Sequence, residues 1–174
     1  LKGKKKRRHV TLEGHRDMVG SVQFNPDGGQ IVTTSLDGNM VVWDAGAGHR
    51  KFGVKFEGVL EDAVFTADSN FIAATAGGEI KILDARNGKV IRVIDRNFDK
   101  YELFLDLAAH PDGKTVAAAS TNGSVFMFDT SSGKLTSQIL DAHTDQVSSV
   151  EFSQDGAMLI SGSFDDTAII WQKQ

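Results

Sequence analysis

The chain has 174 residues, of which 40% are hydrophobic and 24% are charged, and it contains no cysteine. The absence of cysteine excludes disulfides and thiolate metal ligands, and no apolar run approaches the roughly 20 residues that a membrane-spanning helix needs. Of the 19 basic residues, six lie within positions 2–8, so the remainder combines 13 basic with 23 acidic residues and carries a charge of −10. Such an acidic body disfavours broad nucleic-acid binding outside the basic segment. Together with the absence of an apolar secretory signal, these features predict an intracellular protein, cytoplasmic or nuclear.

The first segment in chain order, residues 1–8, is strongly basic. Its charge is concentrated in Lys4, Lys5, Lys6, Arg7 and Arg8. This composition is typical of a nuclear-import signal or a nucleic-acid contact, and it fits a solvated charged tail equally well.

From residue 9 onward the sequence repeats itself. An apolar strand that runs into an Asp-containing turn ends at Phe24, Phe65, Ala109 and Phe152, in steps of 41, 44 and 43 residues. A second marker keeps the same pace at Trp43, Leu83, Phe128 and Trp171. Two independent markers with one period predict four repeats, at about 9–51, 52–89, 90–133 and 134–174.

Each repeat is predicted to form four antiparallel strands, here called a to d. Alternating apolar residues bounded by Gly, Asn and Asp predict strand a at 19–24, 60–65, 104–109 and 147–152, strand b at 30–34, 71–75, 115–120 and 158–162, and strand c at 39–43, 79–83, 124–128 and 167–171. Strand d is expected after the turns at 84–88 and 129–133. Residues 9–13 are also expected to form a strand d that completes the last sheet, which would give 16 strands in all.

The repeat resembles the WD-repeat β-propeller family over residues 9–174. The resemblance rests on the period, on four strands per repeat, and on Gly14-His15 with Trp43-Asp44 and Ala142-His143 with Trp171. It implies an all-β propeller with four blades of four antiparallel strands in this chain. Since rings of this family usually have more blades, we expect part of a larger ring, with a closed four-blade ring and half of a dimeric propeller as alternatives.

The resemblance also implies a buried polar network of His, hydroxyl, Asp and Trp in the first and fourth repeats. The matching residues are His15, Thr33, Asp37 and Trp43, and then His143, Ser161, Asp165 and Trp171. The second and third repeats carry Ala73, Gly77, Leu83 and Ala118, Asn122, Phe128 instead. These two repeats are expected to rely on apolar packing and to open first.

A set of His, Asp and hydroxyl residues also resembles a hydrolase triad. An active site is normally unique, however, whereas this trio recurs at the repeat spacing with its hydroxyl in mid-strand, away from an exposed cleft. We therefore interpret the trio as structural and expect no enzymatic activity.

No metal or other cofactor is predicted, because the remaining histidines, His9, His49 and His110, do not have metal-ligand spacing and are expected at the surface. The glycine pairs Gly28-Gly29 and Gly77-Gly78 are interpreted as hairpin glycines, because neither opens a helix as a phosphate loop does. Residues 95–103, with Phe98 and Tyr101, are predicted to form either a recognition loop or a cap on a blade edge.

Propellers of this family generally bind partners on the face that carries the d–a and b–c loops. The positions expected there are Met18, Gly20, Leu36, Glu61, Ala76, Leu103, Leu105, Thr121, Gln146, Ser148 and Phe164. Apolar Met18, Leu36 and Phe164 would form an interaction patch if the fold brought them together. The predicted function is a protein-interaction scaffold in a multiprotein assembly. The alternative is an RNA-associated factor that uses the basic N-terminus, and self-association is also possible.

Overall fold

The computed structural model describes residues 9–94 and 102–172, and these residues form 15 strands in four antiparallel sheets. We call the sheets blades 1 to 4. Blade 1 contains β1 (Val19–Phe24), β2 (Gln30–Ser35), β3 (Asn39–Asp44) and β4 (Arg50–Lys55). Blade 2 contains β5 (Ala63–Phe65), β6 (Phe71–Ala76), β7 (Glu79–Asp84) and β8 (Val90–Ile94). Blade 3 contains β9 (Phe104–Ala109), β10 (Thr115–Ser120), β11 (Val125–Asp129) and β12 (Leu135–Ile139), and blade 4 contains β13 (Val147–Phe152), β14 (Met158–Ser163) and β15 (Ala168–Gln172).

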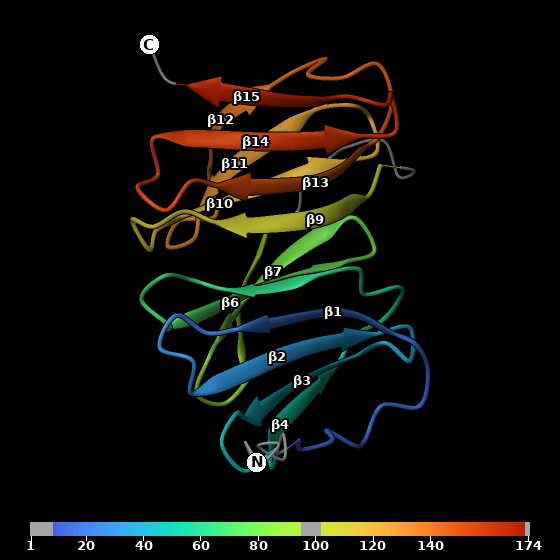
Figure 1. Cartoon of the computed structure of the whole chain (residues 1–174), viewed down its shortest axis with the longest axis vertical. Helices are drawn as coiled ribbons and strands as arrows, with labels where there is room; N and C mark the ends of the chain where they lie inside the picture. The colour runs from blue at the N-terminus through green and yellow to red at the C-terminus, as the bar shows by residue number, and fades with distance from the viewer. Residues whose placement is uncertain (1–8, 95–101, 173–174) are drawn as a thin grey trace, which may run out of the picture.

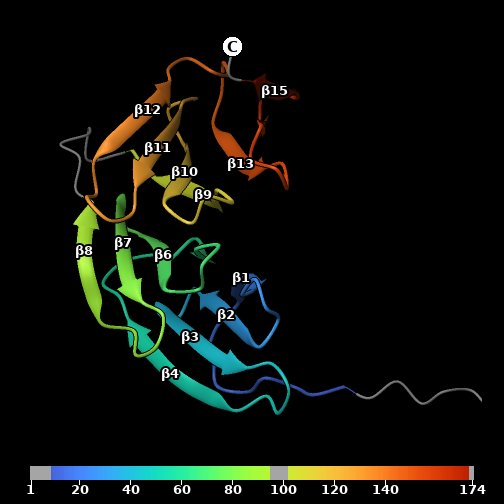
Figure 2. The same ribbon diagram turned by 90° about the vertical axis from the view of Figure 1, so that its left-hand side faces the viewer.

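The blades follow one another along an arc in chain order, from blade 1 at one end to blade 4 at the other (Figure 1). Figure 2 shows β4, β8 and β12 on the convex side of this arc, with β9 and β13 nearer its open side. Each blade is a meander in which neighbouring strands are consecutive in sequence. The fold is therefore the propeller-blade arrangement that the repeat spacing predicts.

Tight turns between strands a and b place one residue in the left-handed backbone region. Gly28, Gly113 and Gly156 have φ values of 73°, 73° and 72°, and Ser69 takes the same conformation at 57°. Glycine adopts this conformation without a steric penalty from Cβ. This is the physical reason for the Asp-Gly element of the repeat.

The hydrophobic core lies between the blades and consists of three clusters, one at each junction. The first includes Val32 and Val42 of blade 1 with Ile72 and Leu83 of blade 2, all at 0% exposure. The second joins blade 2 to blade 3, and the third joins blade 3 to blade 4. Each sheet is thus stabilised mainly by burial of apolar area against its neighbours.

Two predictions about strands are wrong. Residues 9–13 form no strand, and blade 4 therefore has three strands instead of four. Val10 and Leu12 lie over Gly48 in the turn between β3 and β4, so this segment packs on blade 1 and does not pair with β15. Strand a of the second repeat, expected at 60–65, is limited to Ala63–Phe65, while Leu60 is buried between blades 1 and 2 at 1% exposure.

Candidate functional site

Four side chains of blade 1 form a continuous chain of hydrogen bonds. Trp43 Nε1 donates to Thr33 Oγ1 over 2.9 Å, and Thr33 Oγ1 lies 2.7 Å from His15 Nε2. His15 Nδ1 lies 3.2 Å from Asp37 Oδ2. If His15 donates from Nδ1 to the carboxylate, its Nε2 accepts from the Thr33 hydroxyl, and every polar atom of the chain is satisfied. The side chains of His15 and Asp37 are only 7% and 8% exposed.

Blade 4 repeats this arrangement with Ser161 in the place of threonine. Trp171 Nε1 donates to Ser161 Oγ over 2.9 Å, and Ser161 Oγ lies 2.8 Å from His143 Nε2. His143 Nδ1 lies 2.9 Å from Asp165 Oδ2. The structure therefore brings together, in two separate groups, all eight residues predicted to share this network. Their contribution to stability stays a prediction, developed below.

The two hydroxyl groups have no free approach from solvent. Thr33 is 4% exposed and Ser161 is 0% exposed. Each hydroxyl oxygen already accepts from an indole N–H and faces a ring nitrogen. A nucleophile needs an accessible cleft with oxyanion donors, so this geometry supports a structural interpretation of the trio.

Both network aspartates are held in the ionised state. Burial by itself would raise the pKa of Asp37, but N–H donors from Arg16 and Asn39, together with His15, hold that pKa well below its usual range. Asp165 is held low by the Thr167 hydroxyl first, and then by the Thr144 N–H and His143. Hydrogen bonds to a carboxylate favour its charged form.

Blades 2 and 3 replace these networks with apolar side chains. In blade 3, Ala118 and Phe128 are 0% and 1% exposed, and the Phe128 ring meets Phe104 edge-on at a centroid distance of 6.1 Å. In blade 2, the residue that corresponds to Thr33 is Ala74 and not Ala73. Ala74 pairs with Lys81, two residues before Leu83, just as Thr33 pairs with Val41, two residues before Trp43.

The shift in blade 2 arises because its b–c hairpin is one residue shorter than that of blade 1.

The order in which the blades open stays a prediction for hydrogen exchange. Blades 2 and 3 have neighbours on both faces, whereas blades 1 and 4 stand at the ends of the arc (Figure 1).

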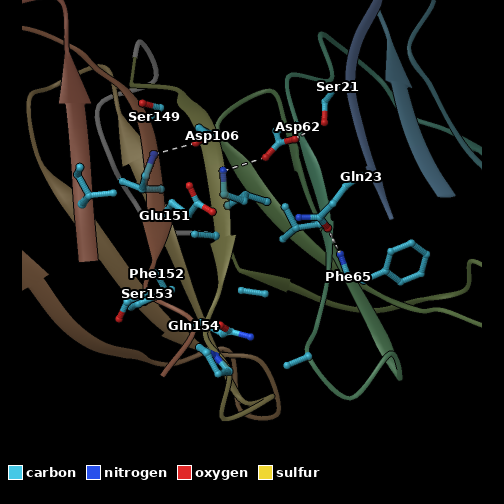
Figure 3. Close-up of a pocket in the computed structure, with 18 of the residues that line it drawn as sticks. Ser21, Gln23, Asp62, Phe65, Asp106, Ser149, Glu151, Phe152, Ser153 and Gln154 are labelled. Atoms are coloured by element: carbon cyan, nitrogen blue, oxygen red, sulfur yellow. Dashed lines mark hydrogen bonds between the residues drawn. The ribbon is translucent and has the colours of Figure 1, made fainter. Parts of the chain in front are cut away.

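A second set of polar contacts, which the sequence interpretation missed, connects the innermost strands of neighbouring blades. Gln23 Oε1 accepts the Phe65 N–H over 2.9 Å, and Asp62 Oδ2 accepts the Leu107 N–H over 2.9 Å. Asp106 Oδ2 accepts the Val150 N–H over 2.8 Å. Figure 3 shows these three bonds crossing from blade to blade. Side chains of one strand a therefore satisfy backbone donors of the next.

The repeat alignment contained a signal for these contacts. Three residues before the aromatic or Ala marker of each strand a stand Ser21, Asp62, Asp106 and Ser149. An acidic residue at the same position of two otherwise apolar strands indicates a shared polar role, because an unpaired buried charge is costly. Asp62 also accepts the Ser21 hydroxyl, over 2.5 Å.

Asp62 and Asp106 lie beside one another at a cavity of about 670 Å³ between the innermost strands. Burial raises the pKa of Asp106 to about 7, and the negative charge of Asp62 and a hydrogen bond with it act in the same direction. The Val150 and Leu107 N–H groups oppose this rise. Asp106 therefore keeps its proton under mildly acidic conditions, where an ordinary aspartate is ionised.

On the face that carries the d–a and b–c loops, Met18, Leu36 and Phe164 are 61%, 47% and 63% exposed. The Leu36 N–H donates to the Met18 carbonyl over 3.0 Å, so these two residues are adjacent. Phe164 N–H makes the corresponding bond to the Gln146 carbonyl in blade 4. Blades 2 and 3 stand between blade 1 and blade 4 along the arc (Figure 1). The exposed apolar side chains therefore form two separate groups, Met18 with Leu36 in blade 1 and Phe164 in blade 4, and not one continuous patch.

The other positions predicted on this face are less exposed. Those that are partly exposed are Glu61, Leu103, Leu105, Thr121, Gln146 and Ser148, while Gly20 is exposed. Ala76 is only 3% exposed, so its assignment to the face is wrong. The shorter hairpin of blade 2 places Gly77 in the position of Leu36, where its N–H bonds to the Val59 carbonyl over 3.2 Å.

The remaining histidines differ from one another. His9 and His49 are exposed. His110 is not a free surface residue, because its side chain is 24% exposed, its Nε2 lies 3.1 Å from the Gly156 carbonyl, and its ring meets Phe152 at 4.7 Å. It therefore connects blade 3 to blade 4.

Within residues 9–94 and 102–172, no group of three or more His, Asp or Glu side chains could hold a metal ion. The same residues include no helix long and apolar enough to cross a membrane. The basic segment Lys4–Arg8 and the aromatic residues Phe98 and Tyr101 lie outside the described residues.

Three proteins illustrate what the chain is similar to. It is 32% identical over 158 residues to WD repeat-containing protein SL1-17 of Schistosoma mansoni, an alignment that covers 88% of this chain and 50% of that protein. It is 25% identical to human Striatin-4, over 94% of this chain and 22% of the relative. It is 31% identical to U3 small nucleolar RNA-associated protein 12 of Saccharomyces cerevisiae, over 60% of this chain and 10% of the relative. The chain thus spans half or less of the length of each of these relatives.

The family model described as "WD domain, G-beta repeat" matches residues 6–44, 97–129 and 134–172. These matches cover the first, third and fourth repeats. The second repeat, which has neither the His nor the Trp of the polar network, lies outside these matches, but its sheet has the same consecutive strand order as its neighbours. With more than half of its residues matched and its four sheets in propeller order, the chain belongs to the WD-repeat family.

Proposed function

We propose that this chain is a protein-interaction scaffold that binds partners through the face carrying the d–a and b–c loops. The observation that carries the proposal is the exposure of large apolar side chains at turn positions of that face. Met18 and Leu36 are adjacent in blade 1, and Phe164 occupies the corresponding turn of blade 4. Apolar residues at such positions are typical of interaction sites, because burying them on a partner removes apolar area from water.

Two further features support a binding role over a catalytic one. The recurring hydroxyl groups are buried in structural hydrogen bonds. Relatives of this chain include proteins named for repeats or for association with other molecules, such as U3 small nucleolar RNA-associated protein 12. We infer an intracellular location from the cysteine-free composition and from the names of these relatives.

The test is capture of partners by the double variant Leu36→Asp/Phe164→Asp. Both side chains are largely exposed, so we expect the fold to be retained while captured proteins are lost. Ile91→Asp/Leu135→Asp is the matched control, because Ile91 and Leu135 are exposed apolar residues on the outer strands β8 and β12. Equal capture by the parent chain and the Leu36/Phe164 variant would end the proposal.

A second candidate function is association with RNA through the basic segment. The charge of residues 4–8 and the printed name of the U3-associated relative favour it. Phosphate contacts by Lys and Arg weaken steeply as salt rises. A salt-dependent mobility shift of labelled RNA that disappears when residues 2–8 are deleted would support this function, and a shift unchanged by the deletion would exclude this segment as its source.

A further inference from the structure

Val59, in the connection between blades 1 and 2, lies on the same face as Met18 and Leu36. Its carbonyl accepts the Gly77 N–H over 3.2 Å, just as the Met18 carbonyl accepts the Leu36 N–H in blade 1. Val59 therefore occupies in blade 2 the position that Met18 occupies in blade 1. Its side chain is 50% exposed, so two neighbouring blades present an apolar side chain at this position.

The segment that carries Val59 is fixed against blade 1 at both ends. At its start, the Phe56 N–H donates to the Gly38 carbonyl over 2.9 Å. At its end, the Thr34 hydroxyl donates to the Glu61 carbonyl over 3.2 Å. These bonds hold the segment beside the b–c turn of blade 1. We call the exposed side chains on these adjoining loops the apolar group: Met18, Leu36 and Val59.

The connections between strands on this face are strongly acidic. They contain ten acidic residues and one basic residue, Arg16, in the described segments 14–18, 36–38, 56–62, 77–78, 102–103, 121–124, 140–146 and 164–167. The connections on the opposite face are balanced, with four acidic and four basic residues in segments 25–29, 45–49, 66–70, 85–89, 110–114, 130–134 and 153–157. Negative charge is therefore concentrated on the face that carries the apolar group.

Two of these carboxylates flank the apolar group and have no counter-charge. Glu57 and Glu61 stand two residues before and two residues after Val59, and both are at least partly exposed. Within residues 9–94 and 102–172, neither side chain forms an ion pair or a hydrogen bond. The adjacent cation, Lys55, is already engaged, because its Nζ donates to the Asp37 carbonyl. A partner that covers these carboxylates without supplying cations would leave charges desolvated and unpaired, which is costly.

We propose that the partner segment that docks on the apolar group is basic, with Lys or Arg residues beside an apolar anchor. The anchor would pack on Leu36 and Val59, and the cations would pair with Glu57 and Glu61. This inference rests on the proposed function and names the chemistry of the partner. Complementary charges speed association and disfavour partners of the wrong sign, so acidic segments and nucleic acids are poor ligands for this face.

The first experiment selects peptides from a displayed library of random sequences on the immobilised 174-residue chain. Peptides that also bind Leu36→Ser/Val59→Ser are removed, because this variant loses two apolar contacts without a change in charge. Circular dichroism shows that the variant is folded. We expect the remaining peptides to have a positive net charge, with Lys or Arg beside an apolar residue. Remaining peptides that are acidic or uncharged, or a failure to recover any peptide that depends on Leu36 and Val59, overturn the inference.

The second experiment measures the affinity of one recovered peptide, labelled with a fluorophore, by fluorescence anisotropy. Glu57→Gln/Glu61→Gln should bind it about tenfold more weakly at low salt, because two exposed ion pairs are lost. Added salt should narrow this difference, since it screens exposed charges. The matched control is Asp27→Asn/Glu151→Gln, which removes two exposed carboxylates outside this face and should bind as the parent does.

The two variants separate this inference from the proposed function. Binding that is lost in Leu36→Ser/Val59→Ser but unchanged in Glu57→Gln/Glu61→Gln would overturn the basic chemistry of the partner and leave the docking face standing. Failure of the proposed function appears in a different measurement, as equal partner capture by the parent chain and Leu36→Asp/Phe164→Asp.

Discussion

The protonated carboxyl group of Asp106 should make the stability of this protein fall as pH rises. Burial and the neighbouring Asp62 raise the pKa of Asp106 from 3.8 to about 7. Between these values the folded chain holds a proton that the unfolded chain has lost, so the free energy of unfolding decreases with pH and levels off above about pH 7. The perturbation that tests this is Asp106→Asn, which is neutral at every pH.

The magnitude follows from the pKa. At about 1.4 kcal/mol per pKa unit, the displacement of Asp106 corresponds to a ceiling of about 4 kcal/mol. Asp106 is partly exposed at the cavity, so solvent screening reduces the expected effect to about 2 kcal/mol. An asparagine can still accept the Val150 N–H through its carbonyl oxygen and can donate to Asp62.

The assay is urea unfolding of the parent chain and of Asp106→Asn at a series of pH values, with free energies obtained by linear extrapolation. We expect similar stability at about pH 4, which serves as the control for the fit of the amide, and a variant more stable by about 2 kcal/mol at about pH 8. A difference between the two proteins that is constant across this range would refute the reasoning.

The polar networks give two further predictions. Thr33→Val removes the buried hydroxyl that Trp43 Nε1 and His15 Nε2 share as a hydrogen-bond partner. The free energy of unfolding in urea should fall by about 2–3 kcal/mol. An equal loss in the control variant Thr136→Val, at an exposed position, would contradict this. Because donors hold the pKa values of Asp37 and Asp165 below 3.8, the stability that these carboxylates contribute is present above that pH and is lost as pH falls below it. Asp37→Asn/Asp165→Asn lacks this contribution at every pH, so the acid transition followed by tryptophan fluorescence should move to higher pH than in the parent chain, and an unmoved midpoint would exclude the two aspartates as its cause.

The sequence by itself determined the features that depend on order along the chain. Its period predicts four sheets, and its alternating apolar residues with left-handed turn positions predict the strands, several with their observed bounds. The resemblance to the WD-repeat family implied that His15, Thr33, Asp37 and Trp43 meet, and the structure brings them together because all four lie in the strands and loops of one repeat. Within a blade, register along the sequence largely fixes register in space.

Only the tertiary structure decided what happens between blades. Asp62 and Asp106 lie in different repeats, and their contact depends on how two sheets pack face to face. The same holds for residues 9–13, whose apolar side chains lie on blade 1 although their pattern is equally suited to the edge of β15. Local patterns record which face of a strand is apolar, but the surface that covers that face is set by packing between segments far apart in sequence.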